Sequence, residues 1–371
     1  MELYEHQKIS INKTIEQSFK TGVHCHATGA GKTITALKLL IEYNNKYKNN
    51  NVLWFSERKN ILTDIFINSS NDYINKVKGR FCIYEFVNNK KNDWFKTRTI
   101  ENKPILIVIN RAYLTYNRNY ENLNLKFNLI IQDECHSCVA KETYKFLKYM
   151  KYKHNSCIIG FSATPIRKDT NSRLKFSDIY ENNLISLYNL RYCIKNNIIL
   201  PPKFLVFSSE NDNFNPGNLK HTIQLFNIIL NYSKFKKIIV YCRNIHICKL
   251  YSNYLYKNKF DNLNDLKICV DTSEKYNDKN FISYEEFKNL ESFGIIFCAM
   301  KHREGSDIKN LDTCIFLDGV RERCELSFIQ CIGRVLRKSA DKKYGLIVDL
   351  YANNFKNFYN KLYSYLSDIE N

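Results

Sequence analysis

Short apolar runs separated by longer amphipathic segments recur along the first half of the chain. Each run ends at polar residues, and the intervening segments are long enough to form helices. The runs are Gly22–Cys25, Val52–Phe55, Ile105–Ile109, Phe127–Ile131 and Cys157–Phe161. Apolar runs that do not alternate with polar residues are typical of parallel strands buried on both faces. The pattern therefore predicts an α/β fold in which helices cover both faces of a parallel sheet.

The second half repeats this pattern after a break. Residues 179–199 have a mostly helical pattern, and the adjacent Pro201 and Pro202 cannot continue a helix. We therefore predict two parallel-sheet domains, residues 1–200 and 201–371, which a length of 371 residues also favours over one core. A final aromatic-rich helix is predicted over 355–369. The second-half strands are predicted at Phe204–Phe207, Ile238–Tyr241, Ile268–Val270, Ile295–Cys298, Cys314–Leu317 and Leu346–Val348.

The charge balance suits a polyanionic partner. Lys and Arg number 56 against 37 Asp and Glu, which gives a net charge of +19. An A/T-rich genome is an alternative cause, because Lys, Asn, Ile, Tyr and Phe are all abundant, and a viral or plasmid gene would fit that composition. The thirteen cysteines are an odd number without regular spacing, so we expect reduced thiols and a cytoplasmic protein. No run approaches the roughly 20 apolar residues of a membrane span.

One stretch has the residues of a phosphate-binding loop. His26–Thr33 reads HATGAGKT and lies between a predicted strand and a helix-patterned run, Ile34–Ile41. Two glycines let backbone N–H groups turn inward, Lys32 can reach the β- and γ-phosphates, and Thr33 can ligate Mg²⁺. The strict motif has glycine where His26 stands. A glycine turn before an ordinary helix is the alternative.

Two carboxylates follow the strand at Phe127–Ile131. Asp133 can hold Mg²⁺ against the phosphates, and Glu134 can orient or deprotonate a water molecule. Acidic residues at the start of the next helix would be the alternative. Together with the phosphate loop, the pair predicts nucleotide hydrolysis. His136 stands between Cys135 and Cys138, but no second ligand pair follows at zinc spacing, so we predict no zinc site.

The second half supplies arginines in the sequence QCIGRVLR. Gln330, Arg334 and Arg337 have i, i+4, i+7 spacing, so on a helix they would share one face. Arginine in this position would stabilise charge on the transferring phosphoryl group. The pattern predicts an ATP cleft between the two domains, and a solvated basic helix face is the alternative.

These motifs and their order resemble those of the superfamily 2 helicases and translocases, the DEAD/DEAH group. The matching segments are HATGAGKT, DECH at Asp133–His136, SATP at Ser162–Pro165, EGSD at Glu304–Asp307 and QCIGRVLR. The finer pattern is most similar to the branch that contains type III restriction subunits and excision-repair DNA translocases, in which a residue such as His26 is tolerated. The resemblance implies two tandem RecA-like domains that use ATP and Mg²⁺.

The resemblance also implies a role for individual residues. Gln7 would recognise adenine, and His136, Ser162 and Thr164 would couple the nucleotide site to the nucleic-acid site. The nucleotide would be held by Thr28, Gly29, Ala30, Gly31, Lys32 and Thr33, with Gly305 and Asp307 near the ribose. Nucleic-acid backbone phosphates would be contacted by Arg58, Arg111 and Arg243.

Three functions stay open at this point. The first is an ATP-dependent DNA helicase or translocase without a membrane partner, whose nuclease or other effector would be a separate protein. The second is an ATP-dependent RNA helicase, because DECH also occurs in proteins that act on RNA. The third is a non-catalytic clamp that binds nucleic acid without turnover, against which Lys32, Glu134 and Arg337 argue.

Overall fold

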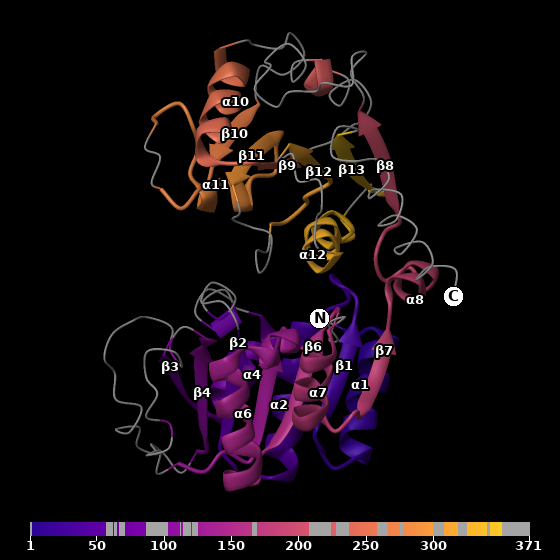
Figure 1. The fold of residues 1–371 in the computed structure, drawn as a ribbon, viewed down its shortest axis with the longest axis vertical. Helices are drawn as coiled ribbons and strands as arrows, with labels where there is room; N and C mark the ends of the chain where they lie inside the picture. The colour runs from indigo at the N-terminus through magenta and orange to yellow at the C-terminus, as the bar shows by residue number, and fades with distance from the viewer. Residues whose placement is uncertain are drawn as a thin grey trace. The chain divides into compact units, whose positions relative to one another are not determined.

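The chain forms two compact units, residues 1–190 and 191–371 (Figure 1). In the computed structural model the described residues are 2–56, 62, 65–66, 71–86, 103–111, 113, 120, 125–164, 169–207, 224–227, 237–257, 266–274, 278–299, 308–317, 325–339 and 342–350. The functional domain limits at 200 and 201 stay a prediction. No helix among these described residues is both long enough and apolar enough to cross a membrane.

Unit 1 is built on a seven-stranded sheet in which every paired strand is parallel. The strand order is β3-β4-β2-β5-β6-β1-β7. Because parallel strands cannot be joined by tight hairpins, each connection must cross over the sheet, which leaves all carboxyl ends at one edge. The strands are β1 (Gly22–His26), β2 (Val52–Ser56), β3 (Cys82–Phe86), β4 (Ile105–Asn110), β5 (Leu129–Asp133), β6 (Cys157–Ser162) and β7 (Leu184–Tyr188).

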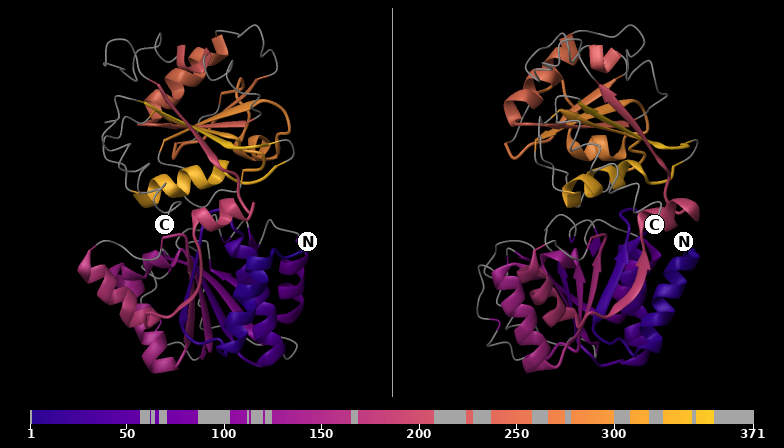
Figure 2. Two further views of the ribbon diagram at one scale, coloured as in Figure 1. Left: turned by 90° about the vertical axis from the view of Figure 1, so that its right-hand side faces the viewer. Right: turned by 45° about the vertical axis from the view of Figure 1, so that its right-hand side comes forward.

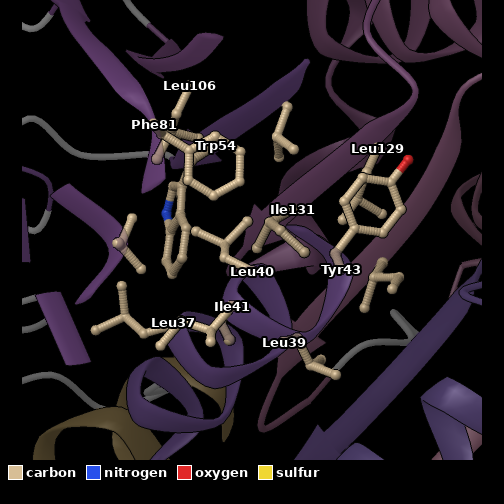
Figure 3. Packing of buried hydrophobic residues seen from close by; sticks show 14 of the residues in the cluster. Leu37, Leu39, Leu40, Ile41, Tyr43, Trp54, Phe81, Leu106, Leu129 and Ile131 are labelled. Atoms are coloured by element: carbon tan, nitrogen blue, oxygen red, sulfur yellow. The ribbon is translucent and has the colours of Figure 1, made fainter. Parts of the chain in front are cut away.

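Helices cover both faces of this sheet (Figure 2), and an apolar core lies on each face; Figure 3 shows side chains of the core that contains α2. On β2, Val52 and Trp54 pack into the core with α2, whereas Leu53 and Phe55 pack into the core with α6. Successive side chains of a strand point to opposite faces, so a continuous apolar run fills both cores. The helices are α1 (Glu5–Glu16), α2 (Lys32–Lys46), α4 (Asp72–Arg80), α6 (Lys141–His154) and α7 (Thr170–Tyr180), with the 3₁₀ helix η4 (Cys135–Val139).

Unit 2 has a six-stranded sheet of the same kind, also with parallel pairs only, in the order β10-β11-β9-β12-β13-β8. The strands are β8 (Pro202–Phe207), β9 (Lys237–Cys242), β10 (Lys267–Val270), β11 (Gly294–Ala299), β12 (Thr313–Leu317) and β13 (Gly345–Leu350). Its described helices are α8 (Leu190–Lys195), α10 (Ile245–Lys257), α11 (Tyr284–Asn289) and α12 (Glu325–Val335). Both sheets confirm the predicted α/β class.

The predicted helix over 179–199 is wrong in its middle. Residues 184–188 form β7, which pairs with β1 alone and so lies at the edge of the sheet. Leu184 and Leu187 are about half exposed there. An edge strand is buried less completely than a central one, so its sequence lacks the continuous apolar run that identified the other strands. Strand β3 at the opposite edge was not predicted either.

Candidate nucleotide site

The loop between β1 and α2 has a backbone suited to an anion. Gly29 and Gly31 adopt positive φ angles of 89° and 81°, in the left-handed region that only glycine enters without strain. Gly31 is also the N-cap of α2, and no side chain accepts a hydrogen bond from the first turn. The Lys32 Nζ donates to the carbonyl oxygen of His26 at 3.3 Å. Backbone N–H groups and the positive end of the helix dipole therefore meet at one loop.

The first turn of α1 holds this loop from the side. The Nε2 of His6 lies 2.8 Å from the carbonyl oxygen of Ala30, and the Nε2 of Gln7 donates to the carbonyl oxygen of Gly31 at 3.2 Å. Gln7 also accepts a hydrogen bond from the backbone N–H of Tyr4 at 2.9 Å. Both His6 and Gln7 are buried. The residue expected at adenine thus lies directly against the phosphate loop.

The strand order brings the two carboxylates to the same edge as the loop. Only β6 separates β5 from β1, and Asp133 is paired in register with Phe161 at the end of β6. Burial, together with the charge of Glu134, raises the pKa of Asp133 to about 7, while the Lys32 ammonium opposes this shift. Lys32 therefore lies within electrostatic range of Asp133. A bound cation would supply counter-charge to this buried carboxylate and lower its pKa.

Glu134 leaves the strand in a strained conformation. Its φ is 51°, a left-handed value that costs a residue with a Cβ roughly 1–3 kcal/mol. Its Oε2 lies 3.4 Å from the Nδ1 of His136, which in turn lies 3.2 Å from the Oγ of Ser162. The Ser162 hydroxyl accepts from the backbone N–H of Thr164 at 3.2 Å. A continuous polar path therefore joins the ends of β5 and β6.

The helix predicted to carry Gln330, Arg334 and Arg337 is shorter in the structure than the sequence suggested. Gln330 and Arg334 are buried and share one face of α12, but this helix ends at Val335, so Arg337 lies beyond the helical face. Beyond the helix end, carbonyl groups that lack an intrahelical donor bind other partners. Leu336 accepts from the backbone N–H of Leu200 at 2.8 Å.

A half-buried lysine also binds the end of α12. The Nζ of Lys342 donates to the carbonyl oxygens of Val335 and Arg337, the latter at 3.1 Å, and to that of Leu311 at 2.8 Å. Burial lowers the pKa of Lys342 to about 8. Three carbonyl acceptors surround one ammonium group, which also complements the negative end of the helix dipole.

The predicted nucleic-acid residues are only partly described. Arg111 directly follows β4 and is half buried, and Arg243 directly follows β9 and is exposed. Both stand at the carboxyl edge of their own sheet. Arg58, Gly305 and Asp307 lie outside the described residues, as do Pro165 and the segment 355–369.

Cys135 of the DECH segment and the nearby Cys138 are packing residues. Both are buried thiols outside any disulfide, and burial raises the pKa of Cys135 well above its usual value. A Cβ added at Gly160 would lie 2.8 Å from both Cys135 and Tyr180, so the sheet and η4 approach closely here. Within the described ranges no group of three metal-ligating side chains is found.

Sequence reasoning missed a buried histidine cluster behind the loop. The side chains of His24 and His26 are joined by three hydroxyl groups, those of Ser10, Thr14 and Ser186, and the ring of His6 lies 6.1 Å from that of His26. Two patterns could have indicated it. His6, Ser10 and Thr14 are spaced i, i+4, i+8 on α1, and His24 and His26 alternate on β1, so each set points to one side.

Two family models match the chain. The model for "Type III restriction enzyme, res subunit" matches residues 1–167, and the model for "Helicase conserved C-terminal domain" matches residues 219–339. One curated relative is "Putative helicase 22" of Sulfolobus islandicus filamentous virus (isolate Iceland/Hveragerdi), which is 25% identical over 362 residues. That alignment covers 88% of this chain and 60% of the viral protein. The chain thus spans less than two thirds of this relative.

Solved structures share the fold of both units. The structure "ATP-dependent Type ISP restriction-modification enzyme LlaBIII bound to DNA" has a TM-score of 0.67 and 15% identity, covering 94% of this chain and 27% of that one. The structure "S. cerevisiae Dbp5 bound to RNA and ADP BeF3" has a TM-score of 0.65 and 13% identity, covering 98% and 88%. These likenesses, with the two parallel sheets, identify the architecture as two tandem RecA-like domains.

Proposed function

Because the chain belongs to the superfamily 2 helicases, in the branch of the type III restriction subunits, we propose that it hydrolyses ATP to move along nucleic acid. One observation carries the proposal. The glycine loop with Lys32 and the carboxylates Asp133 and Glu134 stand at one edge of one sheet, and the charge of Lys32 acts on the pKa of Asp133. These groups are far apart in sequence, so an accidental motif match would not bring them together.

Nucleotide binding would use the loop and the first turn of α1. Backbone N–H groups from Thr28 to Thr33 would bind the phosphates, and the Lys32 ammonium would leave the carbonyl oxygen of His26 for the β- and γ-phosphates. Gln7 would recognise the adenine edge with the second N–H of its Nε2, while the first continues to donate to the carbonyl oxygen of Gly31. The buried amide thus stays hydrogen-bonded throughout.

Magnesium fits the residues present. Thr33 and Asp133 offer a hydroxyl and a carboxylate, the hard oxygen donors that Mg²⁺ prefers, and the raised pKa of Asp133 reflects a buried carboxylate that lacks sufficient counter-charge. When bound, the ion would neutralise charge on the phosphate oxygens.

Glu134 would act on the attacking water. Its left-handed backbone turns it out of β5, and the contact with His136 fixes its carboxylate. The same histidine contacts Ser162, so a change at the γ-phosphate would reach Thr164, just beyond the end of β6, through the His136–Ser162 and Ser162–Thr164 contacts. Arg334 and Arg337 of unit 2, with Gln330, are proposed to stabilise the transition-state charge, and Gly305 and Asp307 to lie near the ribose.

DNA is the proposed polymer, and RNA is the alternative. The family branch favours DNA, whereas the neighbours of similar fold include one titled as bound to DNA and one as bound to RNA. The net charge of +19 suits either phosphate backbone. Arg58, Arg111 and Arg243 are the proposed backbone contacts, which are salt-dependent and insensitive to sequence.

Phosphate release tests the proposal directly. We expect Mg²⁺-dependent ATP hydrolysis that DNA stimulates, with Glu134→Gln reducing kcat by roughly 10²–10⁴-fold while nucleotide still binds. Lys32→Ala should abolish binding and turnover. The exposed residues Glu16 and Lys20 provide matched controls, Glu16→Gln and Lys20→Ala, which should leave both unchanged. Stimulation by RNA alone would exclude DNA as the substrate, and absence of hydrolysis with every polymer would overturn the enzyme proposal.

A further inference from the structure

The buried histidines behind the phosphate loop have a defined arrangement of protons. The Thr14 hydroxyl donates to the carbonyl oxygen of Ser10 at 2.9 Å, and a carbonyl can only accept. The Thr14 oxygen is therefore free to accept the Nε2–H of His24 at 3.0 Å. This leaves the Nδ1 of His24 as the acceptor for the Ser186 hydroxyl at 2.7 Å.

The same logic fixes the next histidine. Because the Ser186 proton points to His24, the Ser186 oxygen accepts the Nε2–H of His26 at 2.7 Å. All hydrogen bonds then run in one direction, from His26 through Ser186 and His24 to Thr14. Two neutral imidazoles satisfy this chain, and an extra proton on His24 would face the Ser186 hydroxyl donor. Burial lowers the pKa of both histidines, which agrees with neutral rings.

This chain of hydrogen bonds explains why His26 can stand at the head of the loop. The His26 side chain points into the cluster between α1 and β7, so it does not fill the space of the loop, and its ring lies 5.0 Å from that of Tyr188. The next residue, Ala27, donates its backbone N–H to the carbonyl oxygen of Tyr188 at 2.9 Å. The start of the loop is thus fixed to β7 by a side chain and by the backbone.

His6 acts on the other side of the loop. Its Nε2 must carry the proton, because the partner at 2.8 Å is the carbonyl oxygen of Ala30. In a planar trans peptide the C=O and the N–H point in opposite directions, and none of the described peptide bonds is cis. Holding the Ala30 oxygen toward α1 therefore turns the N–H of Gly31 away from α1. In the same way, the hydrogen bond from Gln7 to the carbonyl oxygen of Gly31 turns the N–H of Lys32 away from α1.

We infer that His6 is a positioning residue for nucleotide binding, whose neutral imidazole orients the Ala30–Gly31 peptide so that its N–H faces the phosphates. The inference rests on the proposed function of the loop as a phosphate site. The His24–Ser186–His26 chain supports it by fixing β1 and β7 against α1. Because Gly31 has no Cβ, its backbone can adopt many φ values besides the observed 81°, so an external hydrogen bond helps to set the direction of this peptide.

The test compares side chains of different reach at position 6. In His6→Gln the terminal amide nitrogen can replace Nε2, whereas in His6→Asn the amide is one methylene too short. We expect His6→Gln to bind fluorescent mant-ADP with Mg²⁺ within about threefold of the wild-type Kd, and His6→Asn and His6→Phe to bind about tenfold more weakly. KM for ATP should follow Kd, with kcat at saturation changing less. His154→Phe, at the end of α6, is the matched control and should bind as wild type does.

The outcomes separate this inference from the proposed function. Wild-type protein that binds no mant-ADP, or Lys32→Ala that binds it equally well, contradicts the nucleotide site itself. Wild-type binding with equal affinities for His6→Gln and His6→Asn overturns the positioning role and leaves the nucleotide site intact. The Gln and Asn comparison decides the question even when His6→Phe fails to fold, because both polar variants retain a donor in the buried site.

Discussion

The buried histidines should make unit 1 sensitive to acid. His24 is fully buried, and burial lowers its pKa from 6.5 to about 3. The unfolded chain would therefore bind a proton below pH 6.5 that the folded chain does not bind, so the free energy of unfolding must fall as the pH falls. At pH 5 the solution pH is about 1.5 units below the pKa of 6.5 that His24 has in the unfolded chain. At about 1.4 kcal/mol per unit, His24 alone costs about 2 kcal/mol between pH 7 and pH 5.

Other groups change stability over the same range. Burial also lowers the pKa of His6 and His26, which adds to the loss, whereas the raised pKa of Asp133 acts in the opposite direction because its folded carboxyl gains a proton first. The total pH dependence of the wild type is therefore not diagnostic. The comparison with His24→Gln removes only the contribution of His24.

Urea unfolding followed by tryptophan fluorescence measures this difference. Both tryptophans, Trp54 and Trp94, belong to residues 1–190, and Trp54 is fully buried in the core of unit 1. From pH 7 to pH 5 the wild type should lose about 2 kcal/mol more than His24→Gln. The exposed His246 of unit 2 offers a control, His246→Gln, which should retain the wild-type slope. Equal slopes in wild type and His24→Gln would show that His24 is not held neutral, and would refute the reasoning.

Four further predictions concern other parts of the molecule. Lys342→Met removes the donor of three carbonyls, two of them at the end of α12, so steady-state ATPase assays should show kcat falling about tenfold with little change in KM. Leu40→Ala opens a cavity in a fully buried core and should lower the urea-derived free energy of unfolding by about 2–5 kcal/mol. Gly31→Ala would put a Cβ 2.3 Å from the amide nitrogen of Gln7 at a positive φ, so mant-ADP affinity should fall at least about tenfold. An added Cβ at helical Gly79 meets nothing within 4 Å, so Gly79→Ala should raise stability by about 0.5–1 kcal/mol in the same unfolding assay.

In unit 1 the central strands were predictable and the edge strands β3 and β7 were not, whereas in unit 2 the edge strands β8 and β10 were predicted as well. A strand such as β4, buried on both faces, needs apolar residues at every position, and that requirement is visible in the chain itself. Strand β7 alternates buried and exposed positions irregularly and owes its conformation to pairing with β1. Its pairing partner is far away in sequence, so no local pattern reveals it.

The residues of the candidate site also differ in whether the sequence alone could predict them. HATGAGKT and DECH can be identified from the sequence because each is a run of neighbouring residues with one predicted chemical role. Arg337 was predicted on the helical face with Arg334, but α12 ends at Val335, and the carbonyls of Leu336 and Arg337 bind Leu200 and Lys342 instead. The histidine cluster joins residues from α1, β1 and β7, and the contact of His26 with Ser186 spans 160 positions.

The order of apolar and polar residues along this chain is sufficient to predict two parallel-sheet domains, a candidate phosphate loop and a pair of carboxylates. Such features depend on interactions within a few residues, and the periods of strands and helices record them directly. Folding alone brings β5 within one strand of β1, buries Asp133 near Lys32 and aligns the protons of His24 and His26. Those outcomes depend on pairing and desolvation between distant segments, and no short stretch of sequence contains both partners.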